Sequence, residues 1–317
     1  MKIVKTIILC STLLLFNSCQ NSKTENEKIP GIILENMDTS VDPKDDFYNY
    51  VNGNWMKTNT IPDDESRWGG FGVLRKTTRQ DVLEIIKTAQ INDNYKEGSD
   101  QKKALLIFET KLDTIARNKA GIKPIQHLLD AIEGITNIDE LQTVYATITG
   151  VSAPFAGIGA NPDLNDSSVN TAWVFPGGLG LQRDYYIDQD DKTKDIRKDY
   201  LKHVSKMFQF IGYNNTDADN AANLILDLET KLAEPRLDKV ESRDIRNFNN
   251  PMTIDELESL TPSMNWNKLV LDLGIKKSLD QVLVMQPKYM KELNNVLETT
   301  SINDLKTLMK WSTIDNS

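Results

Sequence analysis

Apolar residues recur at helical spacing along most of the chain. In the segment DDFYNYVNGNWM, residues Phe47, Tyr50, Val51 and Trp55 fall close to a period of 3.6 residues, and the segment that starts at Phe71 repeats this pattern. Further helices are expected at about 99–118, 123–134, 138–149, 190–212, 217–235, 288–299 and 302–312. The pattern therefore predicts a mainly α protein.

Several of these helices carry start signals. Thr136, Thr253 and Ser301 each precede an apolar-periodic run and are followed, three positions later, by an acidic residue. A threonine or serine at such a position can accept a hydrogen bond from an exposed backbone amide of the first turn. Pro287 is a start signal of another kind, because proline suits the first helical position.

The stretch from about 151 to 187 departs from the helical pattern. β-Forming residues occupy alternate positions from Val169 to Phe175, the sequence NPDLNDSS has turn chemistry, and glycines cluster at 177–180. A small β-hairpin inserted in the helical body is the simplest interpretation. LDQVLVMQ, at 279–286, has the pattern of one more short strand.

The N-terminus has the pattern of a targeting segment. Lys2 and Lys5 precede the apolar run IILCSTLLLF, which is too short to span a membrane but suits a signal peptide. Ser18 and Cys19 follow, as in a bacterial lipobox, so we predict a lipoprotein signal peptide at 1–18 and lipidation of Cys19. The alternative is an ordinary cleaved signal with an incidental cysteine. The polar stretch 19–36 is interpreted as a tether.

Composition narrows the possible partners and chemistry. A formal charge of −9 and a pI near 5.0 argue against nucleic acid as a partner, which requires a basic face. Cys10 would leave with the signal, so an acylated Cys19 leaves no thiol for catalysis. The histidines, His127 and His203, belong to no H-E-x-x-H motif, and no G-x-S-x-G is present. From the residues alone we predict neither a catalytic nor a metal site in this chain.

Several ordered motifs nevertheless resemble one family. They are MDTSVDPKDDFYNYVNGNWMKTNTIPDDESRWGGFGVLR at 37–75, GGLGLQRDYY at 177–186, LETKLA at 228–233, ESRDIRNFNNPMT at 241–253 and VLVMQPKYMKELNNVL at 282–297. Together they resemble the neprilysin-like zinc metalloendopeptidases, family M13, over about 280 residues.

The resemblance implies a two-lobed enzyme that hydrolyses oligopeptides. One lobe holds zinc through H-E-x-x-H, and the other, a large helical lid domain, encloses the substrate. Residues 37–317 correspond to that lid, in incomplete form, whereas the catalytic lobe would follow beyond residue 317. Zinc is thus expected in the full-length enzyme and not in this chain. Whether the chain end marks a sequence fragment or a true truncation stays open.

The resemblance also assigns substrate-binding residues. Arg67 matches the family arginine that grips the C-terminal carboxylate of the peptide, and Arg75 matches an arginine that supports the same subsite. Trp68 would pack to hold the loop of Arg67, and the glycines Gly69 and Gly70 would let the backbone bend and approach a neighbour closely. The alternative for Arg67 is a surface ion pair with an acidic residue at 63–65.

The sequence leaves two alternative hypotheses for the function. The first is part of an extracytoplasmic zinc endopeptidase, lipid-anchored to the bacterial cell envelope on the periplasmic or outer-membrane side. Its partners would be peptide substrates, the membrane through the lipid anchor, and the missing C-terminal catalytic lobe. The second is a non-catalytic helical surface lipoprotein that binds peptides or glycans.

Overall fold

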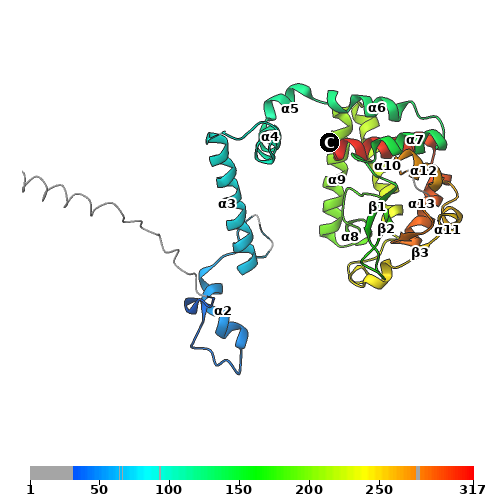
Figure 1. Cartoon of the computed structure of the whole chain (residues 1–317). Coiled ribbons are helices and arrows are strands. Elements are labelled where there is room, and N and C mark those ends of the chain that lie inside the picture. Colours follow the sequence, from blue (N-terminus) through cyan, green and yellow to red (C-terminus); the bar gives the residue numbers. More distant parts are fainter. Residues whose placement is uncertain (1–30, 64, 66, 93, 276–278) are drawn as a thin grey trace, which may run out of the picture. The chain divides into compact units, whose positions relative to one another are not determined.

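The computed structural model describes residues 31–317 except 64, 66, 93 and 276–278. It divides into two compact units, Met1–Leu112 and Asp113–Ser317 (Figure 1). The signal peptide and Cys19 lie outside the described residues, so the lipidation of Cys19 stays a prediction. No helix among the residues that the structure describes has both the length and the apolar character needed to cross a membrane.

The described part of the first unit consists of a short 3-10 helix at Leu34–Asn36 followed by helices α2 (Phe47–Thr58), α3 (Gly70–Asn92) and α4 (Asp100–Leu112). Asp46 caps α2 by accepting a 2.9 Å hydrogen bond from the Asn49 amide. Asp38 packs on the same helix at Gly53, where a Cβ atom would lie 2.7 Å from the Asp38 Cβ, and it accepts a 2.5 Å hydrogen bond from Lys57. The close approach of Asp38 therefore explains why position 53, inside α2, is a glycine.

The second unit holds ten α-helices among its described residues. They are α5 (Thr114–Ala120), α6 (Gln126–Glu133), α7 (Ile138–Ile148), α8 (Asp184–Ile187), α9 (Asp191–Phe210), α10 (Asn215–Ala233), α11 (Ile254–Leu260), α12 (Trp266–Asp272), α13 (Pro287–Thr299) and α14 (Ile302–Asp315). Helices α9 and α10 pack together, and α14 packs on α6, α7, α9 and α10. Helix therefore dominates, as the hydrophobic pattern predicts.

The predicted hairpin is present as β1 (Ala156–Pro162) and β2 (Asn170–Pro176), which pair in antiparallel register. It belongs to a larger sheet of order β1-β2-β4-β3, in which β4 (Val282–Val284) runs parallel to β2 and antiparallel to β3 (Pro251–Met252). The short strand expected near 279–286 is thus confirmed. The description of the hairpin as an insertion in a helical body is incomplete, because β2 is an inner strand of a four-stranded sheet.

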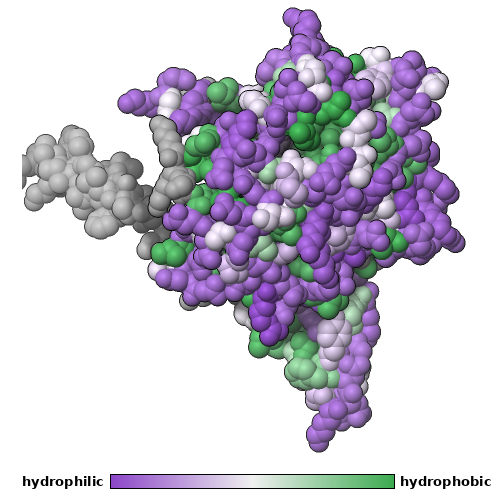
Figure 2. Space-filling view, turned by 90° about the vertical axis from the view of Figure 1, so that its right-hand side faces the viewer, coloured by the Kyte–Doolittle hydropathy of each residue, from purple (hydrophilic) through white to green (hydrophobic). Residues whose placement is uncertain are grey.

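Large side chains fill the core of the second unit. The largest of those with less than 2% of their surface exposed are Trp266, Trp311, Tyr145, Tyr289, Phe155 and Phe208. They come from five helices and from the chain just before β1, and they belong to one apolar cluster that also includes Val174 of β2 and Val282 and Val284 of β4. Polar residues cover most of the face shown in Figure 2, with apolar residues in separate patches.

The predicted helix starts are mostly confirmed. Thr253 forms a complete capping box with Glu256, Ser301 caps α14, and Pro287 is the first residue of α13. The prediction for Thr136 is wrong by one residue. The side chain of Asn137 accepts the hydrogen bond from the Glu140 amide at 3.0 Å, because Asn137 is the residue of extended backbone directly before the first turn.

Several helical segments differ from the expected ranges. The single-turn helix α8 lies at the end of the stretch 151–187, where no helix was expected. The helix expected at 99–118 is two helices, α4 and α5, because Asp113 leaves the helical path and caps α5 through a 2.8 Å hydrogen bond from the Ala116 amide. Helix α12 was not expected. It begins after Asn265, whose side chain accepts a 2.8 Å hydrogen bond from the Lys268 amide.

Candidate functional site

The first turn of α3 and the chain before it surround a hollow of about 340 Å³. The residues that line it are Arg67, Trp68, Gly69, Gly70, Phe71, Gly72 and Arg75. Both arginines that the sequence indicated therefore border one hollow. We call it the α3 hollow.

Arg67 is exposed at the entrance to α3. Asp63 and Glu65, its possible ion-pair partners within the described part of the chain, do not pair with it, and no other described carboxylate lies within 4.0 Å of it. Asp64, the third candidate, lies outside the described residues. The guanidinium of Arg67 thus keeps its hydrogen-bond donors available toward the described surroundings.

Arg75, in contrast to Arg67, forms an ion pair. Its Nη2 atom donates to both carboxylate oxygens of Glu65, each at 2.8 Å. The side chains of Arg75 and Glu65 are 47% and 24% exposed, so the pair contributes no more than about 1 kcal/mol to stability. Its effect is geometric, because it ties the chain before α3 to the helix.

Trp68 lies against the first turn of the helix. A Cβ atom at Gly72 would be 3.0 Å from the Trp68 ring, so glycine lets the ring lie against the helix without displacement. The Nζ atom of Lys76 lies 5.7 Å from the ring centroid, within cation–π range. Arg67 is therefore attached to α3 through its neighbour Trp68.

The expected role of Gly69 and Gly70 is only partly right. The chain bends at Gly69, but a Cβ atom at either glycine would meet no described atom within 4 Å, and neither has left-handed backbone. The prediction of close approach at these two residues is wrong. Close approach occurs at Gly72, a position that sequence reasoning missed. Because Trp68 precedes α3, no helical periodicity indicated its contact with Gly72.

The histidines do not assemble a metal site. His127 is exposed on α6, and His203, on α9, has its Nε2 atom 3.6 Å from a carboxylate oxygen of Asp315. Among the described residues, no three histidine, cysteine or acidic side chains are placed to hold a metal ion. A catalytic zinc takes three protein ligands, so the described donor set does not fit zinc.

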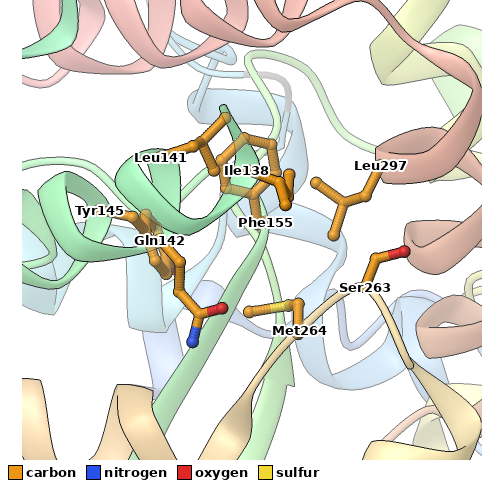
Figure 3. Close-up of a pocket in the computed structure, with 8 residues that line it drawn as sticks. All are labelled: Ile138, Leu141, Gln142, Tyr145, Phe155, Ser263, Met264 and Leu297. Atoms are coloured by element: carbon orange, nitrogen blue, oxygen red, sulfur yellow. The ribbon is translucent and has the colours of Figure 1, made fainter. Parts of the chain in front are cut away.

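A void in the core of the second unit is too small to be a site. Its volume is about 10 Å³, room for about one water molecule, and it lies among side chains of α7, Phe155, Met264 and α13 (Figure 3). Gln142, on its border, is already paired, because its Oε1 accepts the Asn265 amide at 3.0 Å and its Nε2 donates to the Asn265 carbonyl.

Two of the sequence motifs meet at a buried carboxylate. Glu229 of LETKLA accepts hydrogen bonds from the Gly180 amide at 3.0 Å and from the Tyr186 hydroxyl at 2.9 Å, both in GGLGLQRDYY. It also accepts from Tyr200 at 2.5 Å and from the Trp311 indole at 3.3 Å. We call these five residues the Glu229 cluster.

The electrostatics of the Glu229 cluster indicate a structural role. Burial raises the pKa of Glu229, while its hydrogen bonds from Tyr200 and Gly180 act in the opposite direction. Burial and the nearby carboxylate raise the pKa of both tyrosines, so their hydroxyls stay protonated. The cluster holds the motif 177–186 onto helices α9, α10 and α14 and lines none of the hollows described above.

Comparison with known proteins decides the family. The family model described as peptidase family M13 matches residues 43–317, most of the chain. The chain belongs to peptidase family M13. The resemblance found in the motifs is therefore confirmed.

Relatives within M13 match across nearly the whole chain. Endothelin-converting enzyme 1 of Rattus norvegicus is 28% identical over 295 residues, which are 89% of this chain and 38% of the relative. Neprilysin-3 of Drosophila melanogaster is 27% identical over 282 residues, 84% of this chain and 36% of the relative. The chain thus spans less than two fifths of the length of these M13 relatives.

A solved M13 structure shares the fold. The zinc metalloprotease Zmp1 of Mycobacterium tuberculosis, in complex with an inhibitor, superposes with a TM-score of 0.77 at 26% identity. The match covers 89% of this chain and 43% of Zmp1. The mainly helical architecture with its small sheet is therefore that of the corresponding part of an M13 peptidase.

Proposed function

We propose that this chain is the N-terminal, substrate-enclosing part of an extracytoplasmic M13 zinc metalloendopeptidase that hydrolyses oligopeptides. Membership of the family supports the reaction class, and the relatives are named as peptidases. Because the described donor set does not fit zinc, the metal would be held by a C-terminal catalytic lobe, and this chain would contribute to substrate binding.

One observation carries the proposal for substrate binding: Arg67 and Arg75 border the same hollow. A planar guanidinium holds a carboxylate through two parallel N–H bonds, which fixes its direction as well as its charge. Arg67 has its donors available toward the described residues and is attached to α3 through Trp68 and Gly72. It is the residue we assign to the C-terminal carboxylate of a peptide.

Arg75 would act beside it as a positioning residue. One of its terminal nitrogens is used by Glu65, so its charge toward a ligand is partly compensated. The Arg75–Glu65 pair would instead hold the chain before α3 in place, so that Arg67 faces the α3 hollow.

Attachment to the envelope is proposed from the N-terminal sequence. Lys2, Lys5 and the apolar run that follows suit a signal peptide, and Cys19 would carry the lipid. The direct test is metabolic labelling with a fatty acid analogue. Label on the wild-type chain that is lost in Cys19→Ser supports lipidation, whereas label that persists or is never incorporated contradicts it.

The carboxylate role is tested in the complete enzyme with paired peptides that differ only in a free or an amidated C-terminus. Arg67→Ala should lower kcat/KM for the free acid by about 10- to 100-fold, the loss of about 1.5–3 kcal/mol expected for a charged hydrogen bond. The amidated peptide should change little. Arg79→Ala, which alters an exposed arginine of α3 outside the α3 hollow, is the matched control. An equal loss for both peptides would remove the carboxylate role.

The assignment to a peptidase is tested at the level of the gene. Reading the coding sequence past codon 317 should reveal a continuing frame that encodes H-E-x-x-H. A stop codon at that point would instead favour the non-catalytic lipoprotein that binds peptides or glycans.

A further inference from the structure

A hollow of about 320 Å³ lies in the second unit, remote in sequence from the α3 hollow. It is bordered by the motif segment 179–184, by the chain that follows α10, and by Gln286 just before α13. Its charged and polar side chains include Arg183, Asp184, Arg236, Lys239 and Ser242. We call it the Arg236 hollow.

Arg236 is a largely buried cation that forms no ion pair with an acidic side chain of the described residues. Its Nε atom donates to the Leu232 carbonyl at 3.1 Å and its Nη2 atom to the Gly177 carbonyl at 2.7 Å. The guanidinium lies 4.8 Å from the centroid of the Tyr289 ring. No carboxylate of the described residues is within 4.0 Å of it. Among the described residues, its direct contacts are therefore carbonyl dipoles and an aromatic face, while the carboxylate of Glu229 acts on its charge only from beyond ion-pair distance.

The acidic groups of the Arg236 hollow are already engaged. Asp184 pairs with Lys239 at 2.6 Å and with Arg183 at 3.5 Å. Asp238 accepts hydrogen bonds from the backbone amides of Val240 and Glu241, each at 2.7 Å. The nearby carboxylate of Glu241 accepts the Asp238 amide at 3.0 Å.

The polar groups that remain unused are mainly donors. Gln286 accepts the Leu237 amide through Oε1 at 3.0 Å, which leaves the two N–H groups of its Nε2 without a partner among the described residues. The Ser242 hydroxyl and the Nη2 atom of Arg183 likewise make no hydrogen bond within the described chain. The side chains that line the hollow carry three cations against two carboxylates. Surplus donors and a surplus cation suit a bound oxyanion.

From this arrangement we propose that the Arg236 hollow binds a small oxyanionic molecule, through a carboxylate or a phosphate group. Lys239 and Arg183 would contact the oxyanion at the rim of the hollow. Gln286 and Arg236 would contact it from the inner side of the hollow. The site belongs to the second unit and does not depend on the carboxylate role of Arg67. It would exist even if the proposed peptidase function were wrong.

The test is isothermal titration calorimetry of the full chain with succinate and, separately, with inorganic phosphate, at an ionic strength held constant with sodium chloride. Saturable binding with one site per chain is expected. Lys239→Met and Arg183→Gln should each weaken it about tenfold, as expected for one charged hydrogen bond. Lys231→Met is the matched control, because Lys231 is an exposed, ion-paired lysine of α10 outside the hollow.

Each result supports or overturns the proposal. Saturable binding of succinate alone identifies a carboxylate ligand, and binding of phosphate alone identifies a phosphate ligand. Binding of both leaves the shared oxyanion chemistry as the recognised feature. Absence of saturable binding for both anions overturns the site, and so does equal weakening by Lys231→Met, which would indicate non-specific charge attraction. Arg236 is not varied because it also caps α10, and unchanged thermal melting of the other variants shows that they remain folded.

Discussion

The Tyr200 hydroxyl donates a 2.5 Å hydrogen bond to the Glu229 carboxylate, in an environment where only 2% of Glu229 is exposed. Tyr200 belongs to α9 and Glu229 to α10, so the bond joins the two long helices of the second unit. No cation of the described residues is within 4.0 Å of this carboxylate, and its direct partners are hydrogen-bond donors. The stability of this unit should therefore depend on the Glu229 cluster.

Glu229→Ala should destabilise the protein by at least about 3 kcal/mol. The substitution leaves the buried donors of Gly180, Tyr186, Tyr200 and Trp311 without their acceptor, and each unsatisfied buried group costs about 1–3 kcal/mol. Urea denaturation measures the loss. Asp227→Ala, an exposed carboxylate on the same helix, should change the free energy of unfolding by less than about 0.5 kcal/mol. Equal effects of the two variants would contradict the structural role of Glu229.

The contribution of Glu229 to stability should decline as pH rises. Burial raises the pKa of Glu229 in the folded state above the ordinary value of 4.5. Glu229 therefore loses its proton at a lower pH in the unfolded chain than in the folded protein. The folded state then binds more protons, and the free energy of unfolding falls with pH by at most about 1.4 kcal/mol per unit.

Glu229→Gln removes this titration and supplies the reference. The free energy of unfolding of the wild type minus that of Glu229→Gln should be largest at and below about pH 4.5 and should decrease as the pH rises toward neutrality. Denaturation at a series of pH values measures the difference. A difference that is constant or grows with pH would show that folding does not raise the pKa of Glu229.

The glycines of the motif at 177–180 should differ sharply in their tolerance of alanine. A Cβ atom at Gly177 would lie 2.3 Å from the Pro154 carbonyl oxygen, and one at Gly180 would lie 2.0 Å from the Tyr200 hydroxyl. At Gly178 the nearest atom would be 3.8 Å away, an ordinary contact. Overpacking of this kind costs about 1–3 kcal/mol, so Gly177→Ala and Gly180→Ala should lower Tm and Gly178→Ala should not. A similar Tm for all three variants would refute the close packing.

Local signals explain which parts of the fold could be predicted. The capping box of Thr253 lies within four residues, so it is visible in the sequence, whereas Thr136 and Asn137 are both good caps and only the backbone decides between them. The pairing of β2 with β4 joins positions more than 100 residues apart, and no local pattern indicates it. Helix α12 was missed because seven residues are too few to establish a helical period.

The candidate sites were harder to predict from the sequence than the fold. Arg67 and Arg75 stand out only through the family resemblance, and the pairing of Arg75 with Glu65 depends on how the chain enters α3. The role of Glu229 could have been inferred, because it lies on the helix face that also presents Ile225 and Leu232 to the core. A carboxylate among buried leucines and isoleucines requires donors, and the tyrosines that supply them are distant in sequence.

The purified chain should show no chelator-sensitive peptidase activity. Zinc-dependent hydrolysis takes three protein ligands around the metal, and the two histidines of this chain lie on different helices, His127 on α6 and His203 on α9. Hydrolysis of a quenched fluorogenic peptide, measured with added zinc and again after chelation, tests this, with a complete zinc peptidase as the positive control. Cleavage by the chain that stops on chelation and returns with zinc would show that it assembles a metal centre of its own. The division of labour proposed here, with peptide binding by Arg67 and metal chemistry in another lobe, would then be wrong.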